Sequence, residues 1–381
     1  MHGENHHRLS GVGLELLSQP GDVHIQIVHV ESDGQIADRA GDPALSGLLA
    51  RCSGRIDIKT EPAGAAVYVK DVSALDREWQ YLGTSPIAKI RVPFGTFWWK
   101  LEKAGYETVM AAAPTFQIYL SSGIRLPLDF SRVLDRQGKI PPGMVRVQGG
   151  QTDAGRLSDF FVDRYEVTNR QYKEFVDRGG YRLRKYWKHA FVKEGKTLSW
   201  EAAMAQFLDQ TGRPGPSTWQ AGNYAPGQAD YPVSGVSWYE AAAYAEYAGK
   251  SLPTAAHWAL AKGMFTPLFQ ADVFAFGWLG HVSNFKGEGP APVGSSTSMT
   301  SYGAYDMPGN VREWCWNDTR DGKVIRGGAW NDVAYMMSNV SQEPAFDRSP
   351  KKRIPLRPVR GSGRDPREGI ATCRNRRAGG R

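Results

Sequence analysis

The chain has 381 residues, of which 41% are hydrophobic and 23% are charged. This composition excludes wholesale disorder and leaves room for two or three globular domains. The formal net charge is +8, from 47 Lys and Arg against 39 Asp and Glu, but residues 351–381 alone hold eleven Lys and Arg and two acids. The rest of the chain has 36 bases (47 less 11) and 37 acids (39 less 2). A basic surface for nucleic acid is therefore not expected.

The cysteine count and the first residues bear on redox state and location. The three cysteines, Cys52, Cys315 and Cys373, are far apart and odd in number, which favours reduced thiols over a disulfide framework or a closed zinc site. Residues 1–10 are polar and lack the apolar core of a signal peptide, and no apolar run of about 18 residues follows. We expect no membrane segment in this chain. These features predict a cytoplasmic protein, or an envelope-associated one if the N-terminus of the sequence is incomplete.

Residues 1–53 receive no functional assignment. Residues 23–30 alternate between apolar and polar side chains, which is typical of a strand with one buried face. The cluster of His2, His6 and His7 is interpreted as a mobile terminal tract and not as a metal site, because no carboxylate stands at a fixed helical spacing.

Residues 54–110 have the pattern of a small β-domain. Alternating segments at 55–60 and 65–69 flank the turn Glu61-Pro62-Ala63-Gly64, which predicts a β-hairpin. Further strands are predicted at 87–92 and around Trp98-Trp99-Lys100-Leu101. The series resembles a PEGA domain, a β-sandwich named for such a turn, and the resemblance implies a surface or regulatory module. Any small β-sandwich remains the alternative. Residues 111–141 are predicted to hold strands and a linker.

Helix-start patterns appear in the segment from 142 to 350. Thr168 with Gln171, and Ser237 with Glu240, have the spacing of a capping box, and Thr254 follows Pro253 at a third start. Strands are predicted at 144–147 and 160–167. An irregular α+β domain with three modest helices is expected.

Five motifs in this segment resemble the formylglycine-generating-enzyme, or sulfatase-modifying-factor, family. They are Tyr165–Asn169, Pro232–Trp238, Ala248–Thr254, Gly303–Trp314 and Arg326–Trp330. The resemblance implies a C-type-lectin-like fold over residues 142–350, with little regular secondary structure. It also implies a surface cleft for a peptide or small substrate, and calcium in many members.

The main departure from the family concerns its cysteine pair. In oxidase members this pair follows the Arg-Gly-Gly motif and binds copper(I), a soft ion suited to thiolates. Counting on from Gly327, the matching places hold Asp332 and Met337, and no cysteine stands between Cys315 and Cys373. We therefore predict no catalytic residues, no copper or iron, and no oxidation of a sulfatase cysteine. Iron-dependent relatives take their ligands from a histidine-rich domain that this sequence lacks.

Calcium is the better metal hypothesis, because the family's sites use amide, carboxylate and main-chain oxygens. The resemblance points to two stretches, one with Asn310, Val311 and Glu313 and one with Asn284, Phe285 and Glu288. The alternative, given equal weight, is that Asn310 and Glu313 satisfy backbone donors around Trp314. In the first stretch Arg312 replaces the family's usual aromatic residue.

Single reactive side chains receive structural interpretations. Cys315, between Trp314 and Trp316, is expected to be a buried thiol acting as a small hydrophobic residue. His189, His257 and His281 stand singly and are expected to be packed or hydrogen-bonded.

Two functions follow from these features. The first is a catalytically silent family member that binds a protein or small-molecule ligand in a bacterial signalling or envelope protein. The alternative is a metal-dependent oxidoreductase, of the formylglycine-generating or non-heme iron type. Residues 351–381 are rich in Arg, Gly and Pro and are expected to form a disordered tail that lacks the family's closing strand. Nucleic-acid binding through this tail ranks last.

Overall fold

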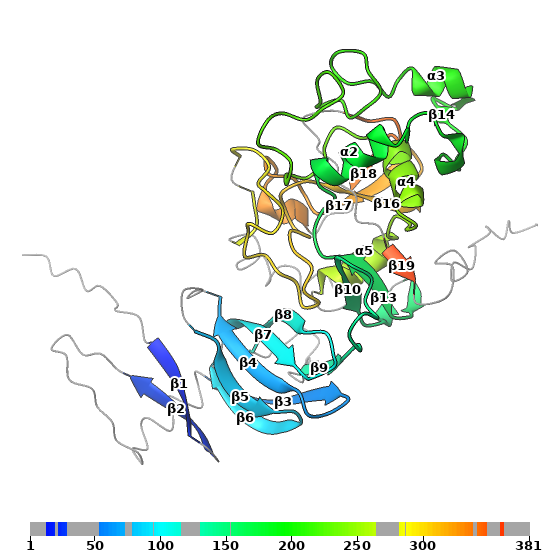
Figure 1. The fold of residues 1–381 in the computed structure, drawn as a ribbon. Coiled ribbons are helices and arrows are strands. Elements are labelled where there is room, and N and C mark those ends of the chain that lie inside the picture. The colour runs from blue at the N-terminus through cyan, green and yellow to red at the C-terminus, as the bar shows by residue number, and fades with distance from the viewer. Residues whose placement is uncertain are drawn as a thin grey trace, which may run out of the picture. The chain divides into compact units, whose positions relative to one another are not determined.

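The computed structural model describes residues 13–19, 22–28, 53–72, 78–93, 95–115, 130–152, 154–263, 282–285, 287–337, 341–348 and 359–361. The chain forms two compact units, Met1–Gln137 and Gly138–Arg381 (Figure 1). Helices are few and short, so the predicted mixed α+β class is confirmed. In the described part of the chain, no helix has the length and apolar character needed to span a membrane.

The first unit is built from strands. They are β1 (Gly13–Gln19), β2 (Asp22–Val28), β3 (Ser53–Glu61), β4 (Ala66–Asp71), β5 (Gln80–Thr84), β6 (Ile87–Pro93), β7 (Thr96–Glu102), β8 (Val109–Pro114) and β9 (Phe130–Val133). Strands β1 and β2 form an antiparallel pair, and two sheets follow with orders β6-β3-β9 and β5-β4-β7-β8. Their alternate side chains, including Ile58, Val67, Trp99 and Leu101, are buried in one hydrophobic core.

The predicted hairpin at residues 55–69 is wrong. Strand β3 pairs with β6 and β9, whereas β4 pairs with β5 and β7, so the turn at 61–64 carries the chain from one sheet to the other. Gly64 takes a left-handed φ of 90° in this turn, and the Ser85 hydroxyl accepts a hydrogen bond from the Ala65 N–H at 3.0 Å. Alternation reveals one buried face on each strand, but it does not tell which strands share a sheet.

The second unit combines short helices with small sheets. Its strands are β10 (Met144–Val147), β11 (Gly150–Thr152), β12 (Gly155–Leu157), β13 (Phe160–Asp163), β14 (Val192–Lys193), β15 (Lys196–Thr197), β16 (Glu313–Asp318), β17 (Lys323–Arg326), β18 (Ser341–Glu343) and β19 (Val359–Gly361). Its helices are α2 (Asn169–Asp177), α3 (Trp200–Met204), α4 (Trp238–Tyr247) and α5 (Ala255–Lys262), with 3-10 turns η1 (Arg184–Tyr186) and η2 (Ala334–Met337). The sheets have orders β10-β13-β19 and β16-β17-β18, beside the pairs β11-β12 and β14-β15.

The three predicted helices begin where their capping residues indicate. Thr168 and Ser237 form complete capping boxes at α2 and α4, and the Thr254 hydroxyl accepts from the His257 N–H at the start of α5. Helix α5 ends at Gly263, which has a left-handed φ of 70°. The described chain also contains α3, only five residues long, which is too short to show helical periodicity in the sequence.

One strand lies in the segment for which a disordered tail is predicted. Strand β19 pairs antiparallel with β13, so the prediction is wrong for these three residues and the unit continues beyond residue 350. A ladder this short depends on main-chain N–H and C=O groups. It therefore needs no apolar periodicity that the sequence could display.

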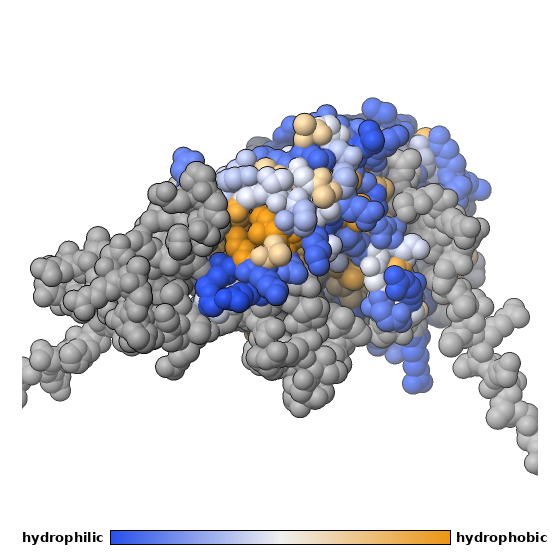
Figure 2. All heavy atoms as spheres, turned by 90° about the horizontal axis from the view of Figure 1, so that it is seen from below, coloured by the Kyte–Doolittle hydropathy of each residue, from blue (hydrophilic) through white to orange (hydrophobic). Residues whose placement is uncertain are grey.

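Aromatic side chains dominate the core of the second unit. Trp219, Trp238, Trp314, Tyr172 and Phe175 are all buried in one cluster. Their polar atoms have partners, since the Trp238 indole donates to the Cys315 carbonyl at 2.9 Å and the Trp314 indole to the Val236 carbonyl at 3.2 Å. Figure 2 shows one side of the molecule, where hydrophobic residues gather in one area bordered by hydrophilic ones.

Candidate functional site

Two of the sequence motifs meet in a buried hydrogen-bond network around Asn310. The Asn310 Nδ2 group donates to Glu166 Oε2 at 2.6 Å. Its Oδ1 atom accepts from Asn284 Nδ2 at 3.1 Å and from the Ala291 N–H at 2.8 Å. Asn310 is 1% exposed, Glu166 is 1% exposed, and Asn310 has a left-handed φ of 58°. These contacts tie the Tyr165–Asn169 motif to the Gly303–Trp314 motif.

The residues predicted to bind calcium lie in two different environments. Asn284 contacts Asn310, whereas Glu313 is buried and accepts from the Trp258 indole through Oε2 at 2.5 Å. Val311 is fully buried and Glu288 is exposed. The Phe285 ring lies against the backbone of Gly309 and Gly328, where an added Cβ would come within 3.0 and 2.8 Å of it. Among the described residues, no group of three or more His, Cys, Asp or Glu could hold a metal.

Two of the three positions that depart from the family pattern, Arg312 and Asp332, contact each other. Arg312 donates from Nε to Asp332 Oδ2 at 2.7 Å and from Nη2 to Asp332 Oδ1 at 2.8 Å, which is a bidentate ion pair. Asp332 Oδ2 also accepts from the Ala329 N–H at 2.7 Å. The hydrogen bonds that Arg312 donates to Asp332, together with the charges of Asp332 and Glu343, raise the pKa of Arg312. We call Arg312 and Asp332 the clamp pair.

The clamp pair is nearly enclosed and joins three segments. The side chains of Arg312 and Asp332 are 12% and 15% exposed. Arg312 Nη1 also donates to Glu343 Oε1 at 3.3 Å. The guanidinium thus links the start of β16, the turn after β17 and the end of β18. At the second cysteine place, Met337 is the last residue of η2.

Thiol chemistry is not supplied by the one described cysteine. Cys315 is free and fully buried, and burial raises the pKa of its thiol well above the usual value. This is the packed role expected from the sequence. Copper(I) requires soft thiolate or thioether ligands, and a carboxylate already held by Arg312 does not fit that requirement.

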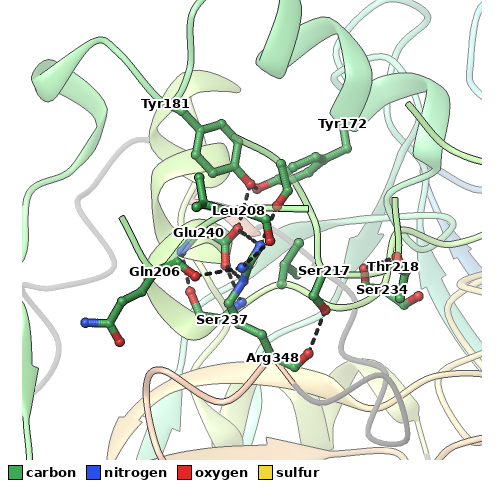
Figure 3. Close-up of polar contacts among 12 residues, drawn as sticks. Tyr172, Tyr181, Gln206, Leu208, Ser217, Thr218, Ser234, Ser237, Glu240 and Arg348 are labelled. Carbon is green, nitrogen blue, oxygen red and sulfur yellow. Dashed lines mark hydrogen bonds and ion pairs between the residues drawn. The ribbon is translucent and has the colours of Figure 1, made fainter. Parts of the chain in front are cut away.

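A second buried polar cluster, which the sequence did not reveal, is centred on Glu240 and Arg348 (Figure 3). Glu240 is 0% exposed at the third position of α4, where Oε2 accepts from the Ser237 N–H at 2.8 Å. Arg348 Nη2 donates to Glu240 Oε1 at 2.9 Å, and Arg348 Nε lies 2.7 Å from Glu240 Oε2. The sequence identifies Glu240 only as a capping residue, because its partner Arg348 is 108 residues away.

The other donors of Arg348 are used on main-chain carbonyls. They bind the carbonyls of Gln206 at 2.8 Å and Leu208 at 2.9 Å, as well as that of Gly215. The Ser217 hydroxyl donates to the Arg348 carbonyl at 2.7 Å. We call this arrangement around Arg348 and Glu240 the arginine anchor.

Two tyrosine hydroxyls complete the arginine anchor (Figure 3). The Tyr181 hydroxyl donates to Glu240 Oε1 at 2.6 Å and lies 3.1 Å from the Tyr172 hydroxyl. Burial, followed by the Glu240 charge, raises the pKa of both tyrosines well above the usual value. Both hydroxyls stay protonated, so the cluster is an ion pair supported by neutral donors.

His257 and His189, two of the three histidines singled out in the sequence, have packed surroundings. His257 Nδ1 lies 2.6 Å from the Thr254 hydroxyl, and its ring meets Phe160 edge to face. Burial lowers the pKa of His257 to about 4. His189 contacts the rings of Trp238 and Trp316. His281 lies outside the described residues.

Comparisons with known proteins address the family directly. The model of the sulfatase-modifying factor enzyme 1-like domain matches residues 131–361. A formylglycine-generating enzyme of Thermomonospora curvata is 33% identical over 212 residues, which are 46% of this chain and 69% of that protein. An inactive Cα-formylglycine-generating enzyme 2 of Bos taurus is 29% identical over 218 residues, 48% of this chain and 69% of that protein.

A serine/threonine-protein kinase of Chlamydia caviae is 32% identical over 203 residues, which are 46% of this chain but only 29% of the kinase. The match begins at residue 131, so strands β1 to β8 lie outside it and the PEGA resemblance stays a prediction. The family model covers more than half of the 381 residues. The chain therefore belongs to the family of sulfatase-modifying factor enzyme 1-like domains.

Proposed function

We propose that this chain is a family member that does not oxidise cysteine and that binds a protein or small-molecule ligand. The observation that carries this proposal is the clamp pair at the predicted place of the first copper-binding cysteine. Both carboxylate oxygens of Asp332 bind Arg312 at 2.7 and 2.8 Å. A hard carboxylate held in this way is a poor ligand for copper(I).

The distribution of thiols supports the same conclusion. Cys315 is fully buried, and the sequence holds no cysteine between it and Cys373. The bovine relative carries the word inactive in its name. An oxidoreductase reaction, the alternative function, would need a metal site other than the family's cysteine pair.

The proposal also includes the kind of protein and the cellular process in which this chain acts. A lectin-like fold for the second unit and a PEGA-like module in the first are both compatible with a binding protein. The relative named as a serine/threonine-protein kinase supports a role in bacterial signalling. An envelope location remains the other setting in which such modules would serve.

Calcium is a further part of the proposal, and the contacts favour one stretch over the other. Asn310 Oδ1 already accepts two N–H groups, and Glu313 Oε2 accepts the Trp258 indole. Asn284 takes part in its side-chain hydrogen bonds through Nδ2 and not through Oδ1. The oxygens of Asn284, Phe285 and Glu288 are thus the better hard-ligand set for Ca²⁺.

Elemental analysis tests the proposal directly. Tag-free protein is dialysed against trace calcium, copper and iron, and bound metals are quantified by mass spectrometry. The same protein is then supplied with copper(I), oxygen and a cysteine-containing peptide, and aldehyde is detected with a hydrazide probe. We expect no stoichiometric copper or iron and no aldehyde. Calcium is expected at one ion per chain, and E288Q should weaken its binding.

The variant D332C/M337C is the matched control, because it restores two thiols at the predicted cysteine places. Copper(I) retained by this variant would show that the assay detects such a site. Stoichiometric copper or iron in the unaltered chain, with oxygen uptake, would contradict the proposal and establish the oxidoreductase alternative.

A further inference from the structure

Positive charge is concentrated in one segment of the second unit, although the chain before residue 351 holds 36 bases and 37 acids. Between residues 178 and 201 the sequence has seven Lys and Arg against two acids, Glu194 and Glu201, and seven less two leaves five positive charges. All nine of these charged residues are exposed. An average over the whole chain conceals a local cluster of this kind.

Three short elements of this segment, η1, the β14-β15 hairpin and α3, are held together by aromatic rings. The centre of the Trp200 ring lies 6.0 Å from that of Trp187 and 6.2 Å from that of Phe191. Figure 1 shows α3 and β14 together at one edge of the second unit. Because the rings are used in packing the elements on one another, the charged side chains form the outer layer.

Basic side chains reach α3 from both η1 and the hairpin. Arg184 Nη2 donates to Glu201 Oε1 at 3.0 Å near the start of α3, and Lys193 Nζ donates to Gln206 Oε1 at 2.7 Å just after its end. The basic residues of η1 and of the hairpin therefore lie beside the same helix. Glu201 balances the charge of Arg184, whereas the partner of Lys193 is a neutral amide.

The β14-β15 hairpin places two like charges opposite each other. Lys193 is the register partner of Lys196, and the turn between them has left-handed φ values of 50° at Glu194 and 75° at Gly195. Like charges directly opposite in an antiparallel pair are destabilising. An anion outside the hairpin would offset this repulsion. The turn has room for one, because an added Cβ at Gly195 would meet no described atom within 4 Å.

Other cations of the segment lack a balancing charge. Arg182, Lys188 and Lys196 form no ion pair with any residue that the structure describes. Asp177, which directly precedes the segment, is already paired with Lys173. The positive charge of this part of the second unit is thus left to be balanced from outside.

Two aliphatic side chains are exposed among these cations. Leu183 is 40% exposed between Arg182 and Arg184, and Val192 is 45% exposed directly before Lys193. Interfacial segments of membrane-binding proteins combine the same two features, because apolar groups enter the bilayer boundary while cations attract anionic headgroups. We call the set Arg182, Leu183, Lys188, Val192, Lys193 and Lys196 the basic surface.

The exposed aliphatic groups distinguish a lipid surface from other polyanions. Single-stranded nucleic acid stacks its bases on free aromatic rings, but the rings of Trp187 and Trp200 are partly buried against each other. A hydrated polyanion leaves Leu183 and Val192 in water. A bilayer removes them from water, and it needs no enclosing cavity.

We propose that the basic surface binds an anionic lipid bilayer, with its four cations over the headgroups and with Leu183 and Val192 in the interfacial layer. Such peripheral binding requires no helix that crosses the membrane. It does not depend on the proposed function, because a chain that oxidised cysteine could bind a bilayer in the same way.

Sedimentation of the full chain with lipid vesicles tests this proposal. One set of vesicles contains phosphatidylglycerol and phosphatidylcholine in equal amounts, and the other contains phosphatidylcholine alone. The chain should sediment with the first set only, and added salt should weaken its binding. R182Q/K196Q should weaken binding about fivefold for each charge removed. L183S/V192S should weaken the binding that persists in high salt by about fivefold or more.

K139Q/R156Q is the matched control, because it also removes one Lys and one Arg, both exposed on other elements of the second unit. It should leave binding unchanged. Every variant keeps the eleven Lys and Arg of residues 351–381, so differences between variants arise at the substituted positions. Near-ultraviolet circular dichroism verifies that each variant is folded.

The proposal is overturned if R182Q/K196Q or L183S/V192S binds as tightly as the unaltered chain, or if K139Q/R156Q weakens binding as much as R182Q/K196Q. Equal binding to neutral vesicles also overturns it. The same holds if oligothymidylate or polyglutamate binds more tightly than the anionic vesicles at the same concentration of anionic groups.

Discussion

At the scale of single residues, the second unit depends on charges that are buried but matched. Glu240 is 0% exposed, and the Arg348 side chain is 11% exposed. Burial by itself lowers the pKa of Arg348, but the charge of Glu240 outweighs it and the pKa is raised. Arg348 therefore stays ionised. Removal of either member of this ion pair would leave the other in a poorly solvated place.

The variant R348M should lower the free energy of unfolding by about 3–5 kcal/mol, because it leaves Glu240 buried without its cation. The double variant E240Q/R348M should lose less, since no charge then remains to be solvated. Urea denaturation followed by tryptophan fluorescence measures both. R184M removes an ion pair between exposed partners and should leave stability unchanged. A loss in R184M as large as in R348M would contradict this account.

The clamp pair shows where residue-level prediction from sequence ends. Both of its members could be recognised as departures from the family pattern, Arg312 for an aromatic residue and Asp332 for a cysteine. Their contact could not be recognised, because they are 20 residues apart in the chain and belong to different turns of the sheet. The spacing of residues within a motif depends on local backbone geometry, whereas an ion pair between distant residues depends on the tertiary fold.

At the scale of elements, we expect the stability of helix α5 to depend on pH through His257. Burial lowers the pKa of His257 to about 4, from an ordinary value of 6.5. The folded state therefore favours the neutral ring, while the unfolded chain takes up a proton first as the pH falls. The stabilising contribution is fully present above pH 6.5 and is lost as the pH falls from 6.5 toward 4.

The unaltered protein should therefore lose more thermal stability between pH 7 and pH 5 than H257N, in which this titration is absent. Thermal unfolding followed by circular dichroism at the two pH values measures the difference in Tm. Equal decreases in Tm in both proteins would show that other groups control this range.

Elements were predictable where their determinants are local. The starts of α2, α4 and α5 followed from side chains three residues apart, because a cap bonds within a single turn. The partner strands of β3 and of β4 were not predictable, because the partners lie farther along the chain. Strand β19 was not predictable for the same reason, because it pairs with β13, almost 200 residues earlier.

At the scale of the whole molecule, the second unit is closed by its own late segment. The Phe346 ring stacks on Phe207 with centres 5.5 Å apart and meets Tyr239 at 4.7 Å. The Trp238 N–H donates to the Ala345 carbonyl at 3.1 Å. With the arginine anchor, these contacts fix residues 341–348 against α4 and the loop that follows α3.

A chain that ends at residue 350 should keep a cooperative unfolding transition in its second unit, because it retains Phe346 and Arg348. A chain that ends at residue 340 should lose that transition, since it lacks the anchor and β18. Near-ultraviolet circular dichroism on heating distinguishes the two, because the core is rich in buried tryptophan. Loss of the transition in both chains would instead make β19 essential.

The arginine anchor also sets an order of events during synthesis. Arg348 follows Glu240 by 108 residues, so a ribosome adding roughly 5–20 residues per second needs several seconds to supply the partner of an already emerged α4. During that interval the aromatic surfaces of Phe207 and Tyr239 lack their Phe346 cover. Until residues 346–348 have left the exit tunnel, these aromatic side chains of the nascent second unit therefore stay without their final packing partners.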